Sequence, residues 1–128
     1  MAKNIYGPGP HKTFVATAGA AIVAGDLLVR SSTKWVPATD GQQAEGYAVT
    51  GATGDTVEFV CCTEEGIEVA LTGALAVNAT AYVLSAQAID AGSQNNKHCG
   101  IVTKVCPWDS TKNIVKLHFK DAETTTHA

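Results

Sequence analysis

Short runs of β-forming residues, each ended by glycine, aspartate or asparagine, divide almost the whole chain. Turn signals such as Asp-Gly at 40–41 and Thr-Gly-Asp at 53–55 separate runs that are too short for helices. No window has the periodicity and caps of a long amphipathic helix. The sequence therefore predicts an all-β fold, a single small antiparallel barrel or sandwich. The expected strands are 13–17, 27–30, 34–37, 45–50, 56–62, 66–72, 81–84, 98–105 and 113–120.

The nearly uncharged stretch AGAAIVAGDLLV, residues 18–29, is open to several interpretations. A membrane helix needs about 20 apolar residues, and Gly25 and Asp26 interrupt this one. A secretory signal is not expected, because the small residues at 16–18 do not follow an apolar stretch of about 7 to 15 residues. Glycine costs a helix about 1 kcal/mol relative to alanine. We therefore expect strand, turn, strand, with Gly25 at positive φ and the Asp26 carboxylate bonded to nearby backbone amides.

The chain begins with a segment that has two Gly-Pro pairs, at 7–10. This segment, residues 1–12, cannot form a regular element and is expected to be an extended arm. The arm should be loosely placed when free, because ordering costs about 1 to 2 kcal/mol per residue, and fixed when a partner holds it. A β domain at 13–120 follows, and the polar sequence DAETTTHA at 121–128 is expected to be a flexible tail.

The sequence also contains two similar halves at an offset of about 54 residues. AIVAGDLLV at 21–29 superposes on LAVNATAYV at 75–83, and GYAV at 46–49 superposes on GIVT at 100–103. TVEFV at 56–60 corresponds to IVKLH at 114–118. An Ala/Val/Gly-rich composition could produce this likeness by chance. If the duplication is real, it predicts two similar β units that share one core.

Length and charge narrow the class of protein. A chain of 128 residues suits one domain that can bury a core without metal or disulfide support. The net charge is −3, and the nine Lys and Arg residues are scattered singly. Binding to nucleic acid needs a basic stripe that neutralises several phosphates. We therefore expect no nucleic acid partner, and no membrane partner either.

The four cysteines are Cys61, Cys62, Cys99 and Cys106. They are few for the chain length, and no secretory signal places them in an oxidising compartment, so free thiols are expected. Cys61 and Cys62 would point to opposite faces of a strand and cannot face one metal ion. The others lack paired C-x-x-C or H-x-x-x-H spacing. The sequence predicts no metal site, no required disulfide and buried thiols that act as small apolar side chains.

Enzymatic motifs are incomplete. GYAVTGAT at 46–53 has the glycine spacing of a phosphate-binding loop, but Ala52 stands where the loop needs a lysine. A cysteine could attack a substrate with a histidine as base, yet nothing in the sequence arranges such a pair. We expect no catalytic residues and no cofactor, although a small β-barrel enzyme remains an alternative.

The order of these motifs resembles the bacteriophage capsid cement, or head decoration, proteins. Members carry an apolar-x-Ala-Gly-Asp-apolar-apolar turn near the N-terminus, here VAGDLL at 23–28. The likeness covers about residues 14–119, and the motifs are turns and strands rather than catalytic signatures. The chain departs from the pattern in its four cysteines, in the His98-Cys99 pair and in the sequence CPWD at 106–109. The remaining motifs are GYAV at 46–49, residues 54–60, LTG at 71–73, GIV at 100–102 and the last alternating strand.

The resemblance implies a structural protein that binds the exterior of an assembled capsid and cements neighbouring major capsid subunits against internal pressure. It also implies a homotrimer, made in the host cytoplasm and located in the virion. The mild negative charge and the extended arm fit this function, because an arm can add to a neighbour's sheet edge and many weak copies gain avidity. The expected capsid or subunit contacts are Lys3, Ile5, Tyr6, Lys12, Phe14 and Trp108.

A different class of function is also open. A carbohydrate-binding or adhesion module on a virion or cell surface would use exposed aromatic side chains. The candidates are Trp35, Tyr47, Tyr82 and Trp108, although each is also a candidate for the core or for an interface.

Overall fold

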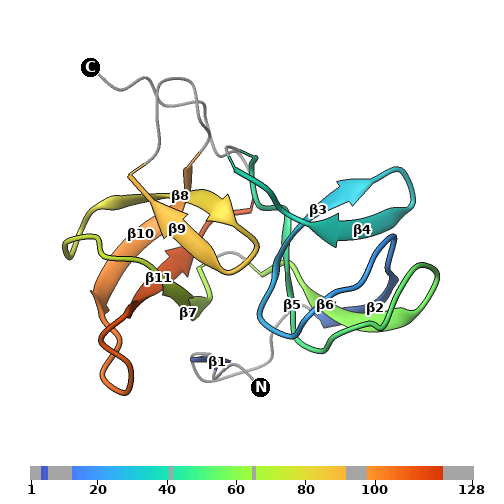
Figure 1. Cartoon of the computed structure of the whole chain (residues 1–128), viewed down its shortest axis with the longest axis horizontal. Helices are drawn as coiled ribbons and strands as arrows, with labels where there is room; N and C mark the ends of the chain where they lie inside the picture. The colour runs from blue at the N-terminus through green and yellow to red at the C-terminus, as the bar shows by residue number, and fades with distance from the viewer. Residues whose placement is uncertain (1–3, 6–12, 41, 65, 92–97, 120–128) are drawn as a thin grey trace.

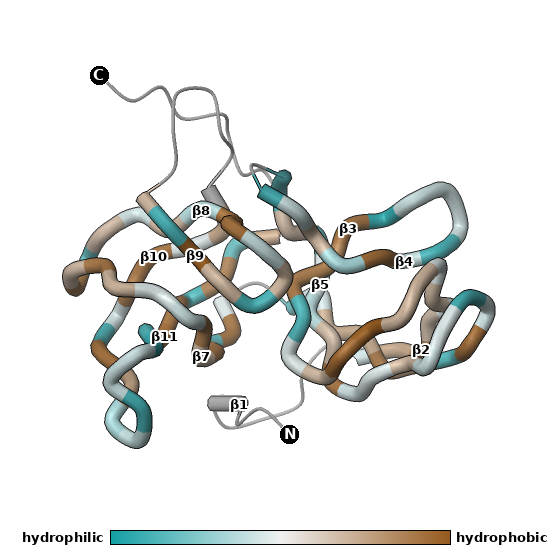
Figure 2. The backbone as a smooth tube through the Cα atoms, viewed as in Figure 1, coloured by the Kyte–Doolittle hydropathy of each residue, from teal (hydrophilic) through white to brown (hydrophobic). Residues whose placement is uncertain are grey.

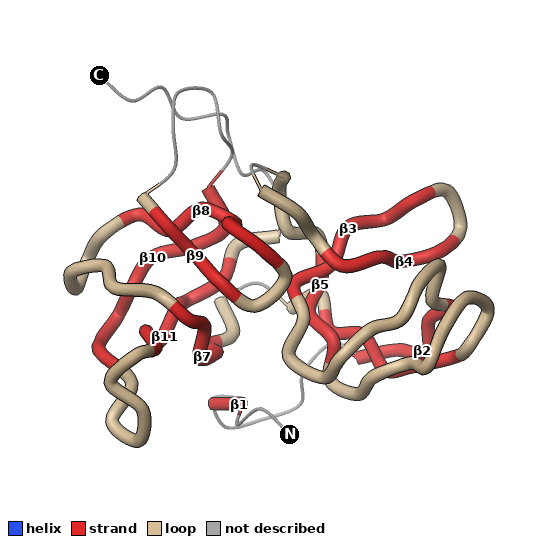
Figure 3. The backbone as a smooth tube through the Cα atoms, in the orientation of Figure 1, coloured by secondary structure: helices blue, strands red, loops and turns tan. Residues whose placement is uncertain are grey.

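The computed structural model of the chain describes residues 4–5, 13–40, 42–64, 66–91 and 98–119. All regular elements in these residues are β-strands, so the predicted all-β class is confirmed. Figures 1 and 3 show the strands arranged as two units that lie side by side. The strands are β1 (Asn4–Ile5), β2 (Thr13–Thr17), β3 (Leu27–Ser31), β4 (Lys34–Pro37), β5 (Gly46–Ala48), β6 (Glu58–Cys62), β7 (Glu68–Thr72), β8 (Thr80–Ser85), β9 (Ala88–Asp90), β10 (His98–Val105) and β11 (Lys112–Leu117).

The first unit consists of β2 to β6. Its five-stranded sheet has the order β2-β6-β5-β3-β4, and each neighbouring pair is antiparallel. A parallel bridge between Ala18, directly after β2, and Trp35 on β4 joins the two ends of the sheet. The N–H of Gly19 donates to the carbonyl of Trp35 at 2.8 Å in the same place. The sheet thereby closes into a small barrel, which we call the first barrel.

The second unit consists of β7 to β11, with the order β7-β11-β10-β8-β9. Parallel pairing of Thr72 on β7 with Ala88 on β9 closes this sheet as well, and we call it the second barrel. The short strand β1 extends the sheet by pairing antiparallel with β7, where Asn4 lies opposite Val69 and Ile5 lies opposite Glu68. The segment between β1 and β2 is outside the described residues.

The two barrels have the same topology when β2 to β6 are matched in order with β7 to β11. Equivalent tight turns, at 23–26 and 76–79, precede β3 and β8. In each turn the N–H of the fourth residue donates to the carbonyl of the first at 3.0 Å. The third residue has positive φ in both, 99° at Gly25 and 73° at Asn78. Glycine and asparagine are the residues that tolerate this conformation best. The expected two similar β units are therefore present.

The structure corrects the predicted alignment of the two halves at this turn. The predicted offset of 54 residues places Gly25 on Ala79, whereas the hydrogen bonds and positive φ place it on Asn78, 53 residues away. The offset of 54 does relate Gly46 on β5 to Gly100 on β10. Sequence similarity alone misses the difference, because Ala, Val and small polar residues align nearly as well in either register.

The buried side chains form two clusters, not the single shared core that a duplication predicts. Neighbouring residues of the first barrel divide between them, because adjacent strand residues point to opposite faces. Leu28 and Cys61 belong to a smaller cluster whose members all come from the first barrel, whereas Leu27 and Cys62 join a larger cluster. The larger cluster also contains second-barrel residues such as Val102. The first barrel thus has its own interior and packs its other face against the second barrel. Figure 2 shows apolar stretches in strands of both barrels.

Hydrogen bonds also connect the barrels beside the first turn. The N–H of Leu27 donates to the carbonyl of Ala86 at 2.6 Å, and the amide of Gln87 donates to Oδ1 of Asp26 at 2.9 Å. Oδ2 of Asp26 accepts the N–H of Val23 at 2.9 Å, as the sequence predicts. The buried Asp26 carboxylate therefore holds its own turn and the β8–β9 hairpin together.

Three expectations about strands require correction. The strand expected before the first turn is reduced to Ile22, which forms an isolated bridge with Ala52. The sequence does not predict strand β9, which has three residues and is a strand only through its pairing with β8 and β7. The expectation of no regular element in residues 1–12 is wrong at Asn4–Ile5, which forms β1. The edge of β7 supplies the backbone partners that so short a segment lacks alone.

Candidate interaction surface

The four cysteines are free and buried, as the sequence predicts. Burial raises the pKa of Cys61 from 9.0 to about 12, and it raises the pKa of Cys99 from 9.0 to about 12 as well. Burial also raises the pKa of Cys62. A thiol attacks as the thiolate, so these side chains are poor nucleophiles at neutral pH. Among the described residues, no group of three His, Cys, Asp or Glu side chains is placed to hold a metal ion, and no helix could cross a membrane.

These thiols make stability depend on pH in the alkaline range. Cys61 and Cys99 stay protonated in the folded chain up to about pH 12, but in the unfolded chain they ionise near pH 9.0. The unfolded state therefore binds fewer protons above pH 9, and the free energy of unfolding should fall as pH rises from 9 towards 12. Chemical denaturation at a series of pH values measures this. A Cys61→Ala, Cys99→Ala double variant should lose less stability over that range, and an equal loss would contradict the assignment.

Two aromatic rings meet where β2 and β4 of the first barrel lie next to each other. The rings of Phe14 on β2 and Trp35 on β4 are 6.1 Å apart at a tilt of 55°. The guanidinium of Arg30 lies 5.9 Å from the centre of the Trp35 ring, within range of a cation–π contact. Trp35 is buried, whereas Phe14 is 41% exposed. Beside Phe14, Val15 is 64% exposed. We call Thr13, Phe14 and Val15, together with Arg30 and Trp35, the β2 edge patch.

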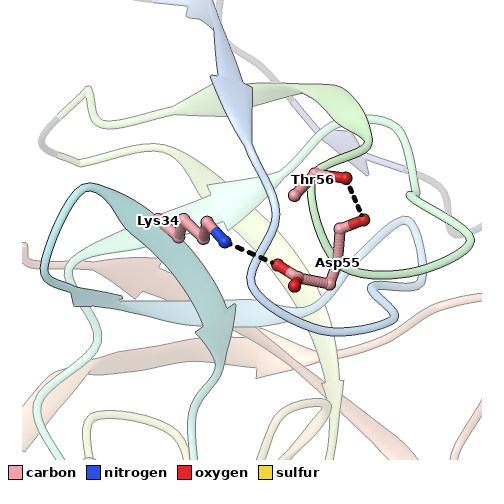
Figure 4. A network of polar contacts seen from close by, with 3 residues as sticks. All are labelled: Lys34, Asp55 and Thr56. Carbon is pink, nitrogen blue, oxygen red and sulfur yellow. Dashed lines mark hydrogen bonds and ion pairs between the residues drawn. The ribbon is translucent and has the colours of Figure 1, made fainter.

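A polar network holds β4 against the β5–β6 loop of the same barrel (Figure 4). Nζ of Lys34 lies 2.9 Å from Oδ1 of Asp55, and the hydroxyl of Thr56 donates to the Asp55 carbonyl at 2.5 Å. Thr56 has a φ of 70°, uncommon for a β-branched residue. Both charged groups are substantially exposed, so the ion pair adds about 0 to 1 kcal/mol at most. Its effect is to position this loop, not to form a site.

The loop between β10 and β11 presents Trp108, which is 45% exposed. The loop is ordered by its own hydrogen bonds. Oδ1 of Asp109 accepts the N–H of Thr111 at 3.0 Å and its hydroxyl at 2.6 Å. These bonds hold the pKa of the Asp109 carboxyl below its usual range. The N–H of Cys106 donates to the carbonyl of Lys112 at 3.0 Å and closes the base of the loop. Trp108 is therefore an aromatic side chain on a well-defined turn.

The predicted contact residues fall in several places. Lys3, Tyr6 and Lys12 lie outside the described residues, and Ile5 belongs to β1. Phe14 and Trp108 are both exposed, as a contact residue requires. Strand β2 and the β10–β11 loop belong to different barrels, and Figure 1 shows them towards opposite ends of the molecule. The structure therefore does not join the predicted contacts into one patch. The sequence does not indicate Val15 and Arg30, which the structure places beside Phe14 and Trp35.

The aromatic residues considered for carbohydrate binding are mostly buried. Tyr47 and Tyr82 are fully buried, and Trp35 is 7% exposed. A sugar-stacking platform needs an exposed ring face, so of the four candidates Trp108 is the exposed one. Comparisons with protein-family models, with curated proteins and with solved structures found no match.

Proposed function

We propose that the chain is a structural bacteriophage head protein that binds the outer surface of the assembled capsid and cements neighbouring major capsid subunits. One observation carries the proposal beyond the sequence resemblance. Two exposed aromatic residues, Phe14 and Trp108, lie on different barrels that a common buried cluster joins. A cement must contact two subunits at once and resist their separation, and a rigid module with two separated apolar contacts has that design. The proposed partner is the major capsid protein.

Other features support a binding function of this kind. In the part of the chain that the structure describes, the exposed large hydrophobic side chains are valines, one leucine and the two aromatics, spread over both barrels. Exposed apolar side chains that are scattered singly are normal on a protein surface, so the adjacent pair Phe14 and Val15 is the part of this surface that best suits burial against another protein. Many copies on a symmetric lattice gain avidity, so each contact can be small. Self-association as a homotrimer at threefold positions, which the resemblance implies, is part of the proposal, because closed symmetry avoids open-ended assembly.

Binding to assembled heads tests the proposal. Heads built from the major capsid protein should co-sediment with the chain in a saturable manner, and decorated heads should survive heating better than bare heads. Phe14→Ala and Trp108→Ala should each weaken binding at least tenfold, about 1.4 kcal/mol, because each removes one aromatic contact. Val77→Ala is the matched control, since Val77 is 49% exposed but is not a predicted contact.

Two results would count against the cement function. The first is the absence of co-sedimentation by the parent chain, and the second is binding that does not depend on Phe14 or Trp108. A glycan array is the companion experiment, because strong glycan binding that Trp108→Ala abolishes would favour the adhesion module instead.

A further inference from the structure

The internal repeat allows the two barrels to be compared strand by strand, and they differ at one sheet edge. Strand β7 of the second barrel carries β1 on the side away from β11, opposite Glu68 and Val69. The equivalent residues of the first barrel are Thr13 and Phe14. They lie opposite Cys62 and Cys61 of β6, and the offset of 54 matches these to Lys116 and Val115 of β11, which lie opposite Glu68 and Val69. Among the described residues, no strand pairs with β2 at this position.

The backbone of β2 is oriented to receive a strand there. The N–H of Ala18 donates to Val57 beside β6 at 2.9 Å. Donors and acceptors alternate in direction along a strand, so Thr13 and Val15 direct their N–H and C=O groups away from β6. The second barrel has the same pattern. The N–H of Gly73 donates to Thr111 on the β11 side, and the N–H of Thr72 donates to Gln87 on the opposite side.

Side-chain exposure also differs between the two equivalent edges. Phe14 is 41% exposed, whereas its equivalent Val69 is fully buried. Val15 is 64% exposed, and its equivalent Ala70 is only partly exposed. The sequence of β2, TFVAT, has no lysine, proline or acidic residue, which are the usual means of protecting an open edge. An uncharged edge with two exposed apolar side chains favours pairing with another chain.

We propose that the open edge of β2 accepts a short extended segment of the major capsid subunit as an added antiparallel strand, with Phe14 and Val15 contacting its side chains. This proposal rests on the proposed function and locates its binding site. The occupant is not β1 of a second copy, because each chain supplies β1 once and β1 already occupies the edge of β7; the proposed function supplies the capsid subunit as the partner. The bridge from Ala18 to Trp35 blocks the far end of β2, so the added strand must be short, as β1 is.

Proline substitution tests the pairing directly. Val15→Pro removes an N–H that points to the open edge and takes no part in the β2–β6 ladder, so the domain should fold. The variant should bind heads at least tenfold more weakly than the parent chain. Val15→Thr is the matched control, because it keeps the N–H and the β-branched shape; it should weaken binding less than about threefold. Equal melting temperatures of the three proteins would show that the effect is not loss of fold.

Amide hydrogen exchange measured on the unmodified chain tests the same pairing without any substitution. The amides of Thr13 and Val15 should exchange rapidly in the free chain and become at least tenfold slower on heads, because a new strand covers them. If both amides stay fast on heads that are saturated with the chain, the edge is not the contact, although the cement function stands. If the parent chain does not bind heads, the proposed function itself fails.

The oligomeric state identifies a competing occupant. Sedimentation of the free chain at increasing concentration should give the same assembly for the parent and for Val15→Pro. If the parent self-associates and Val15→Pro does not, a second copy covers the edge and the assignment to the capsid subunit is overturned.

Discussion

Replacing Gly100 with alanine is expected to lower the free energy of unfolding by about 3 kcal/mol, the largest loss expected for alanine at any glycine that the structure describes. Gly100 is buried on β10, and a Cβ atom there would overlap the carbonyl oxygen of Lys116 and lie 2.8 Å from Cγ1 of Val115. The overlapped oxygen belongs to the backbone of β11, which pairs with β10 on one side and β7 on the other. The strand cannot move away without breaking a ladder. Urea denaturation measures the loss.

Two other glycines serve as controls for this prediction. A Cβ at the related Gly46 would meet Sγ of Cys61 and Cζ3 of Trp35, both at 2.9 Å. These are side-chain atoms that can shift, so Gly46→Ala should cost less than Gly100→Ala. A Cβ at Gly54 would meet no atom within 4 Å, so Gly54→Ala should leave stability unchanged or raise it by about 0.4 to 1 kcal/mol. Equal losses at Gly100 and Gly54 would contradict the steric explanation.

Gly25→Val is expected to cost about 2 kcal/mol or more, because a β-branched residue is strained at a φ of 99°. The same turn carries Asp26, whose carboxylate bonds to Val23 and to Gln87 of the second barrel. Distortion of the turn should therefore weaken the contact between the barrels as well. The melting temperature and urea denaturation measure the effect, and an unchanged melting temperature would show that the turn does not require positive φ.

The equivalent turn of the second barrel supplies the control for Gly25. Asn78 adopts a φ of 73° at the same position, which shows that asparagine is accepted in this turn. Gly25→Asn should therefore cost clearly less than Gly25→Val. Asn78→Gly should produce no loss, because glycine is the residue best suited to that conformation. If valine and asparagine at position 25 are equally harmful, side-chain bulk rather than φ explains the loss.

The shared cluster and the hydrogen bonds at Asp26 make the two barrels one mechanical unit. Leu27 takes part in both, since its side chain joins the larger cluster and its N–H donates to Ala86. The β2 edge patch adjoins the smaller cluster of the first barrel, and the backbone of β3, on which Leu28 faces that cluster and Leu27 faces the shared one, connects it to the barrel that carries Trp108. This rigidity is what the proposed cement function needs, because a flexible link between two contacts would let the capsid subunits separate.

Strand positions are predictable where local sequence is sufficient. The bounds of β2, β4 and β10 agree with the predicted runs, since each run ends at residues that disfavour further pairing or begin a turn. Strand β9 is not predictable, because AID at 88–90 has no alternation of its own and pairs only through contacts with β8 and β7. Strand β1 escapes prediction for the same reason, since two residues acquire strand structure only from the edge they meet.

The candidate site is predictable only in part. The sequence indicates Phe14 and Trp108 as contacts, and both are exposed. It does not indicate the open edge of β2, because an edge is recognised as open only when the pairing of all the strands is known. The one signal in the sequence is the internal repeat, which relates β2 to β7. That signal becomes useful only after the register is known, since β1 lies opposite particular residues of β7.

By itself, the sequence determined the all-β class, the positive-φ turn at Gly25 and the free thiols, and it indicated two related halves without deciding between a duplication and chance. These depend on local preferences: glycine at a strained turn, alternation along a strand, and the lack of ligand spacing among the cysteines. Only the tertiary structure decided that each half closes as a barrel and that the buried side chains form two separate clusters. Closure depends on the bridge from Ala18 to Trp35 and on the pairing of Thr72 with Ala88, contacts between residues 17 and 16 positions apart. The division of the core arises because neighbouring residues such as Leu27 and Leu28 face opposite sides of the first barrel's sheet. The sequence does not show that the second barrel packs against the outward side, where Leu27 lies.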